Sequence, residues 1–211
     1  MPAEPSIKRA IAFIDGPNLF HAAKDAFGYR HPNYDVVLLS QAVCQQQGWQ
    51  LTETRFYTGI PDIADDAFWN HFWVAKLAAM GRQNVQVYSR SLRYRNQTFQ
   101  LPGGGNHTIL VGQEKGIDIR LALDVVRAVH RNRCDVAVIF SQDQDLSEVA
   151  DEVRGIAQDH QRWIKIASAF PDSPTRTNHR GVNRTDWIKL DRTTYDARID
   201  AADYRPKRSQ P

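Results

Sequence analysis

Short apolar runs alternate along the chain with longer stretches that are apolar on one side. The strand-like runs are RAIAFID, LTETRFYTG, NVQVYSR, DVAVIFS and WIKIASA, with a late DWIKL. Helical spacing of apolar residues between them predicts helices at 17–28, 34–47, 62–80, 117–131 and 146–160. This alternation predicts an α/β fold, in which a mainly parallel β-sheet carries helices on both faces. The uninterrupted runs AIAFI and VAVIF are typical of strands in the middle of such a sheet.

Residues 90–113 interrupt the alternation. The sequence SLRYRNQTFQLPGGGNHTILVG alternates polar and apolar residues around a turn rich in Pro and Gly, which predicts an inserted β-hairpin. We expect one domain over residues 8–192. Residues 193–211 are polar and basic, which favours a flexible tail unless a partner protein orders it.

The predicted helix 62–80 carries two stripes of large side chains. We expect Phe68 and Phe72, with Ala75, to pack against the sheet. Trp69 and Trp73 form the second stripe, and three interpretations remain open for it: the core, a contact in a homodimer, or stacking of nucleobases.

Acidic residues stand where two predicted strands end. Asp15 ends AIAFID, and Asp143 and Asp145 follow VAVIFS. Ligands of open α/β sheets bind beyond the carboxyl ends of strands, where the strand order reverses. If these two strands are neighbours, the three carboxylates meet in one crevice. Helix capping is the simpler interpretation: Asp15 would cap the helix opened by GPN, and Asp145 would form a capping box with Glu148.

The helix 117–131 contributes a further acid. Asp118 lies within the apolar arc of the helical wheel but in the first turn, so we expect it at the rim of the core rather than inside it. Asp124 lies on the polar arc between Arg120 and Arg127, which predicts an exposed face held by ion pairs. A cluster of Asp carboxylates suits a hard divalent cation such as Mg²⁺ or Mn²⁺, which can activate water for phosphodiester hydrolysis.

Three segments together resemble the NYN domain family, the LabA-like branch of the PIN-like ribonucleases: FIDGPNLF, EKGIDIRLALDVV and DVAVIFSQDQDLSEVADEVR. RFYTGIP also fits, and the likeness spans about residues 8–170. The resemblance implies a PIN-like (Rossmann-like) fold and metal-dependent hydrolysis of RNA, with the metal-binding acids carried by Asp15, Asp118, Asp143 and Asp145.

The resemblance also implies supporting roles outside the acids. Asn18 would orient a carboxylate or water. Lys115 is the lysine of the family's Lys-Gly-x-Asp motif and would contact phosphate. Where the family usually has Ser-Gly-Asp, this chain has Gln142 in place of the glycine, which narrows the expected cleft or weakens catalysis.

Composition and charge add little to the choice of function. The 211 residues include 27 Lys and Arg against 24 Asp and Glu, so the net charge is small. Local basic surfaces are predicted instead, and two interpretations remain open: they hold RNA phosphates, or they are ordinary solvated surface. The residues concerned are Arg93, Arg95, Arg176, Arg180 and Arg184. Cys44 and Cys134 lack zinc-site spacing, which predicts buried free thiols. The lack of a signal-like or membrane-spanning stretch predicts a cytoplasmic protein without a membrane partner.

The sequence therefore predicts a metal-dependent ribonuclease without a side-chain nucleophile. One alternative is an inactive NYN domain that binds RNA or a protein. A more distant one is a nucleotide-sugar transferase, because DQD resembles an Asp-x-Asp metal signature, but it leaves Asp15 and Asp118 without a role.

Overall fold

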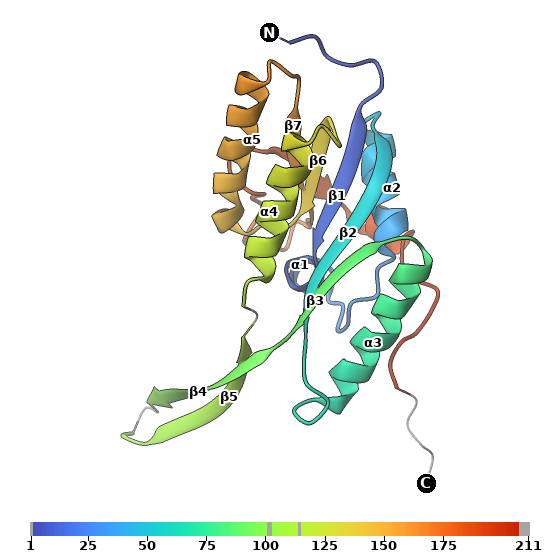
Figure 1. The fold of residues 1–211 in the computed structure, drawn as a ribbon. Helices are drawn as coiled ribbons and strands as arrows, with labels where there is room; N and C mark the ends of the chain where they lie inside the picture. The colour runs from blue at the N-terminus through green and yellow to red at the C-terminus, as the bar shows by residue number, and fades with distance from the viewer. Residues whose placement is uncertain (1, 101–102, 114, 207–211) are drawn as a thin grey trace.

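A twisted parallel sheet forms the centre of the molecule (Figure 1). The computed structural model describes residues 2–100, 103–113 and 115–206. Across the sheet, the strands are β3 (Gln86–Ser91), β2 (Gln50–Ile60), β1 (Arg9–Asp15), β6 (Val136–Phe140), β7 (Lys165–Pro171) and β8 (Asp186–Leu190). Every neighbouring pair is parallel. The predicted α/β fold is confirmed.

Helices cover both faces of this sheet. One face carries α1 (Gly16–Phe27), α2 (Val36–Gln46) and α3 (Ala67–Arg82), and the other carries α4 (Ile117–His130) and α5 (Ser147–Asp159). The alternation of side chains along β1 explains the division, because successive side chains of a strand point to opposite faces. Ala12 and Ile14 pack with the first group of helices, whereas Ile11 and Phe13 pack with the second.

The strand order reverses beside β1. The chain passes from β1 outward to β2 and β3, and then returns to β6 on the other side of β1. Ile14 of β1 is paired with Phe140 of β6, so Asp15 and Ser141 follow at adjacent strand ends. The two acidic strand ends are therefore neighbours, as the crevice interpretation required.

The inserted hairpin predicted at 90–113 is present. It consists of β4 (Arg93–Gln100) and β5 (Asn106–Gln113), which pair antiparallel in a two-stranded sheet of their own. Figure 1 shows it as an arm that extends from the end of β3 away from the main sheet and returns to the start of α4.

The packing of α3 differs from the expected stripes. Phe72 is buried, but Phe68 is 43% exposed and Ala75 faces solvent. The buried face runs instead through Phe72, Trp73, Lys76, Leu77 and Met80. Trp73 therefore belongs to the core, because the helix is rotated toward its tryptophan stripe, and the long stem of Lys76 completes the buried face.

The prediction of a flexible tail is wrong for residues 193–206. A short helix, α6 (Arg192–Asp196), buries Tyr195 completely. Beyond it, Asp200 pairs with the buried Lys76 at 3.0 Å, and Tyr204 packs against the core. The sequence pattern does not indicate this packing, because the residue that pairs with Asp200 is a buried lysine of α3. Residues 207–211 of the predicted tail lie outside the described residues.

The cysteines behave as expected: Cys44 and Cys134 are buried free thiols, and burial raises the pKa of each to about 12. In the part of the chain that the structure describes, no helix combines the length and apolar character needed to cross a membrane.

Candidate active site

Asp15 joins the end of β1 to the end of β6. Its Oδ1 accepts a hydrogen bond from the Asn18 backbone N–H at 3.1 Å, so the capping interpretation is confirmed. Its Oδ2 accepts from the Ser141 hydroxyl at 2.9 Å, and only 4% of the residue is exposed. Gly16, the next residue, lets the end of β2 pack closely, because a Cβ there would lie 2.9 Å from the Tyr57 carbonyl oxygen. Asp15 is thus both a helix cap and a link between the two neighbouring strand ends.

Asn18 fixes the segment that follows β6. Its side-chain Oδ1 accepts from the Gln142 backbone N–H at 2.9 Å. Gln142 is itself buried, and its side-chain amide donates to the Arg180 carbonyl at 2.7 Å. The residue does not have a positive φ, so glycine is not required for the backbone at this position. The Gln142 side chain anchors a neighbouring loop.

Asp143 continues the same chain of hydrogen bonds. Its backbone N–H donates to the Ser141 hydroxyl oxygen at 3.1 Å, and its Oδ1 accepts from the Asp145 N–H at 3.0 Å. Asp143 thereby caps the 3₁₀ turn Gln144–Leu146. The predicted capping box of Asp145 is wrong, since α5 begins at Ser147 after Leu146 without a side-chain cap. Asp145 is exposed.

Asp118 lies at the rim, as expected, in the first turn of α4. Solvent reaches its side chain, yet surrounding protein removes part of the water around the carboxyl. The pKa of Asp118 is raised by this partial burial first, and then by the negative charges of Asp143 and Asp145. The three acids therefore share one electrostatic neighbourhood.

The four carboxylates predicted to share one ion are not grouped closely enough to do so in the present side-chain positions. Among residues 2–100, 103–113 and 115–206, no three Asp, Glu, His or Cys side chains are grouped so that they could hold a metal. The chemistry of the donors nevertheless fits a hard cation, because Mg²⁺ commonly uses one or two protein carboxylates and completes its shell with water and substrate phosphate. Asp15, Asp118 and Asp143 would supply such oxygens.

Comparison with known proteins identifies the family. The model of the NYN domain family matches residues 9–171. The chain belongs to this family. Among solved structures, this NYN domain is similar to a protein of unknown function from Vibrio parahaemolyticus, with a TM-score of 0.55 and 14% identity over 90% of this chain and 97% of that chain. At that identity the likeness concerns the fold alone. None of the curated proteins compared with the chain matches it.

Asp124 of this NYN domain is buried, which corrects the predicted exposed face. Its Oδ2 accepts from the Tyr57 hydroxyl at 3.0 Å and from Arg120 at 2.9 Å, and Arg127 lies 3.6 Å from Oδ1. The ion pairs are those expected. The burial arises because α4 packs over β2, whose Tyr57 covers that side of the helix.

The predicted phosphate-binding residues lie in several separate places. Lys115 and Arg93 line one open hollow at the base of the hairpin, and Arg95 lies two residues further along β4. Arg180 belongs to the loop that Gln142 anchors. Arg176 and Arg184 lie elsewhere: Arg176 donates to the Pro171 carbonyl, and Arg184 pairs with Asp151 of α5.

The sequence analysis missed Ser141 and Gln144 as supporting residues. The Ser141 hydroxyl donates to Asp15 and accepts from the Asp143 N–H, so it sets the two acids relative to each other. The Gln144 amide nitrogen donates to the carbonyl oxygens of Gln142 and Gly181, at 2.9 and 3.0 Å. The Ser-x-Asp spacing could have indicated Ser141, but no sequence pattern marks Gln144.

An aromatic hollow of about 300 Å³ lies on the other side of the strand ends. Phe20, Trp69 and Tyr94 contribute rings to it, and Thr58 and Gly59 line it from the end of β2. Trp69 is only partly buried, so base stacking stays a prediction for this residue.

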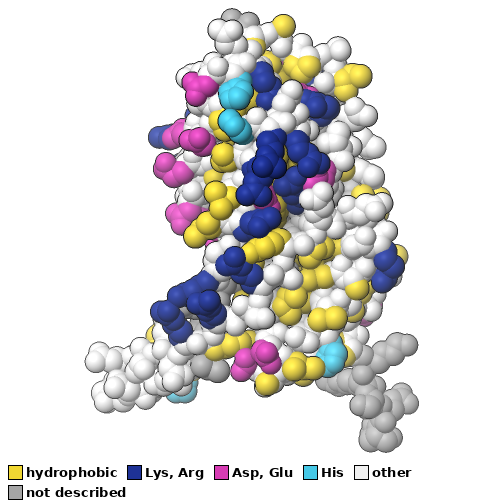
Figure 2. Space-filling view, in the orientation of Figure 1, with side chains coloured by type: hydrophobic (Ala, Val, Ile, Leu, Met, Phe, Trp, Pro, Cys, Tyr) yellow, Lys and Arg dark blue, Asp and Glu magenta, His cyan; other side chains and the backbone are white. Residues whose placement is uncertain are grey.

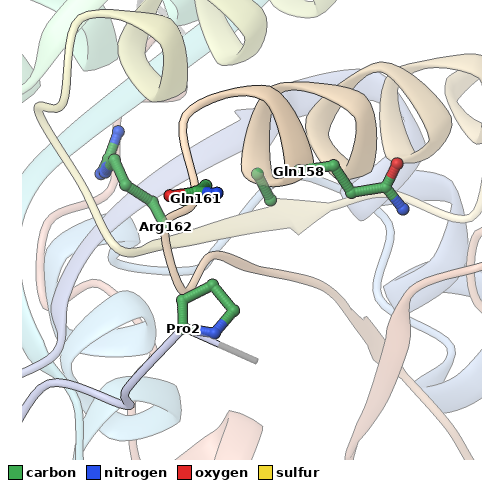
Figure 3. Close-up of a pocket in the computed structure, with 5 residues that line it drawn as sticks. Pro2, Gln158, Gln161 and Arg162 are labelled. Atoms are coloured by element: carbon green, nitrogen blue, oxygen red, sulfur yellow. The ribbon is translucent and has the colours of Figure 1, made fainter.

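A hollow of about 560 Å³ lies at the far end of α5 and has no acidic residue in its lining, which is formed by Pro2, Ala157, Gln158, Gln161 and Arg162. Figure 3 shows the polar ends of Gln158 and Arg162 pointing in opposite directions. Arg162 donates to the carbonyls of Val129 and Cys134. This hollow does not have the convergent polar groups of a catalytic site.

Proposed function

We propose that this NYN domain is a cytoplasmic, metal-dependent ribonuclease that hydrolyses RNA phosphodiester bonds at the carboxyl ends of β1 and β6. The observation that carries the proposal is the hydrogen-bonded chain from Asp15 through Ser141 to Asp143, with Asp118 close enough to have its pKa raised by the neighbouring acids. A carboxyl group whose pKa is raised by partial burial and by neighbouring acids, as that of Asp118 is, is typical of functional sites.

The acids would hold Mg²⁺ or Mn²⁺. Burial and two hydrogen bonds fix Asp15, and Asp143 is oriented by Ser141 and by its own capping role. Asp118 and Asp145 are exposed, so they have the freedom to approach a cation or its water ligands. When bound, the ion supplies a more acidic water and neutralises charge on the phosphoryl oxygens.

The chain's own residues would position the substrate. Asn18 orients the segment after β6 through the Gln142 N–H and therefore sets the direction of Asp143. Lys115 is exposed three residues before Asp118 and would pair with a phosphate oxygen beside the acids. Arg180, on the loop held by Gln142, would approach from the opposite side.

The proposal is tested by cleavage of a single-stranded RNA with Mn²⁺. We expect the wild type to cleave, and Asp143→Asn to reduce the rate by about two orders of magnitude or more, because it removes a metal ligand. Asp25→Asn is the matched control: it makes the same change on the exposed side of α1 and should cleave at the wild-type rate. Equal rates for wild type and Asp143→Asn would refute the site.

The inactive-domain alternative makes a different prediction in the same assay. RNA binding without cleavage by the wild type, at every Mg²⁺ and Mn²⁺ concentration, would support that alternative. The family and the hydrogen bond that joins Asp15 to Ser141 beside Asp143 both favour the ribonuclease over the transferase alternative.

A further inference from the structure

Five linked arginines lie beside the proposed active site, four of them reached by solvent and Arg55 buried beneath them. We call them the arginine ladder: Arg55, Arg90, Arg120, Arg127 and Arg133. They come from β2, β3, α4 and the turn that follows α4. Figure 2 shows dark blue side chains running from the base of the hairpin arm up the middle of this face. We propose that the arginine ladder binds the phosphate backbone of a single RNA strand and leads that strand to Asp118.

Buried carboxylates hold the ladder from beneath. Glu53 pairs with Arg55 at 2.5 Å and Arg133 at 3.0 Å, and Asp124 pairs with Arg120 at 2.9 Å. The side chains of Glu53 and Asp124 are 9% and 7% exposed, whereas those of Arg120 and Arg133 are 40% and 55% exposed. Solvent therefore meets Arg120 and Arg133 rather than the two carboxylates, whereas Arg55 is itself buried beside Glu53. The four guanidinium groups that solvent reaches, those of Arg90, Arg120, Arg127 and Arg133, outnumber the two carboxylates and leave an excess of positive charge at the surface.

Tyr88 links the ladder to the site. The Arg120 guanidinium carbon lies 4.8 Å from the centre of the Tyr88 ring, and that of Arg90 lies 5.4 Å from it. Arg90 also donates to the Lys115 carbonyl at 3.2 Å. Gly116, with a φ of 75°, leaves room for this contact, since a Cβ there would lie 2.7 Å from an Arg90 nitrogen. The ladder thus ends at the turn into α4, two residues before Asp118.

Phosphate is the ligand that this arrangement favours. Guanidinium groups pair with phosphate through two parallel hydrogen bonds and keep their charge at any physiological pH. The ion pairs and ring contacts already hold these side chains in place, so less conformational entropy is lost on binding. The choice of RNA rests on the proposed function, because the ladder runs directly to the acids assigned to RNA hydrolysis.

The test measures RNA binding without cleavage. Fluorescence anisotropy of a labelled oligouridylate of about 20 nucleotides, with a chelator present, reports binding alone. The ladder variant combines Arg90→Gln, Arg127→Gln and Arg133→Gln, and it should bind roughly tenfold more weakly or worse. Its salt dependence should flatten by roughly 2 units of slope, since about three phosphate contacts are lost.

Two controls accompany the ladder variant. A control variant combines Lys24→Gln, Arg30→Gln and Arg82→Gln, which remove the same charge from exposed positions outside the ladder, and it should bind within about twofold of wild type. A second ladder variant with Lys at the three changed positions should keep most of the affinity, which would show that lost charge rather than misfolding weakens the Gln variant.

Failure of the ladder and failure of the proposed function give different results. Equal binding by the wild type and the Gln ladder variant would overturn the ladder, even if the wild type cleaves RNA. A wild type that never cleaves would overturn the nuclease, while the contrast in binding would still stand. Ladder-dependent binding to vesicles rich in phosphatidylserine, with no binding to the oligouridylate, would overturn RNA as the ligand.

Discussion

Replacing Asn18 by alanine tests how the two strand ends are held together. The change removes the acceptor of the Gln142 backbone N–H, which lies in a buried residue. A buried donor left without a partner costs about 1–3 kcal/mol. Alanine recovers about 0.5 kcal/mol through its better helix propensity in α1. We therefore expect the free energy of unfolding to fall by about 1–2 kcal/mol, which corresponds to roughly 2–8 °C in melting temperature for a chain of this size.

Urea denaturation measures the global effect, and hydrogen exchange of the Gln142 amide measures the local one. In Asn18→Ala that amide should exchange faster than in the wild type, because its hydrogen bond is lost. RNA cleavage should fall as well, since Asp143 follows directly. Asn18→Asp is the control that keeps an acceptor oxygen: its Gln142 amide should stay protected, although added negative charge beside Asp15 lowers stability without a cation.

The reasoning would be refuted by an Asn18→Ala protein that unfolds within about 0.5 kcal/mol of the wild type and keeps the same Gln142 exchange rate. In that case the side chain of Asn18 does not hold the segment after β6. Loss of activity with unchanged exchange would instead indicate that Asn18 acts on the substrate.

Three further predictions concern packing and charge. Gly16→Ala should lower the free energy of unfolding in urea by about 1–3 kcal/mol, because its Cβ overpacks against β2. Asp200→Asn should lower the free energy of unfolding by about 3 kcal/mol, since it leaves the buried Lys76 ammonium without its anion. Lys76→Met should lower it far less, and equal losses for the two variants would contradict the buried pair. Asp135→Asn should lower the free energy of unfolding by about 1–2 kcal/mol at neutral pH. Burial alone would raise the pKa of Asp135, but hydrogen bonds from the half-exposed Arg9 outweigh it and lower that pKa, so the folded state favours the charged carboxylate. The wild type should lose this advantage as the pH falls below about 4, and a loss that stays constant with pH would exclude the linkage.

The fold and the placing of the candidate site at one edge of the sheet follow from local patterns in the sequence. The continuous apolar runs identify β1 and β6 as central strands, and the acids directly after them must then meet at one edge of a parallel sheet. The first-turn position of Asp118 likewise indicates a rim location.

Features that depend on long-range packing could not be predicted in this way. Asp124 is on the polar arc of α4, and only the position of Tyr57 on β2 explains its burial. The C-terminal segment is polar in composition, yet its Asp200 pairs with Lys76, a buried residue of α3. In each case a charged side chain, Asp124 or Lys76, is buried against partners that are distant in the sequence, and helical or strand periodicity carries no information about those partners.

The central claim is that the acids at the ends of β1 and β6, with Asp118, hold a divalent cation. Anomalous diffraction from crystals soaked in Mn²⁺ tests it most directly. The account predicts a manganese peak among the carboxylates of Asp15, Asp118 and Asp143, and loss of that peak in Asp143→Asn. Manganese bound only elsewhere on the molecule, or a peak unchanged in Asp143→Asn, would contradict it.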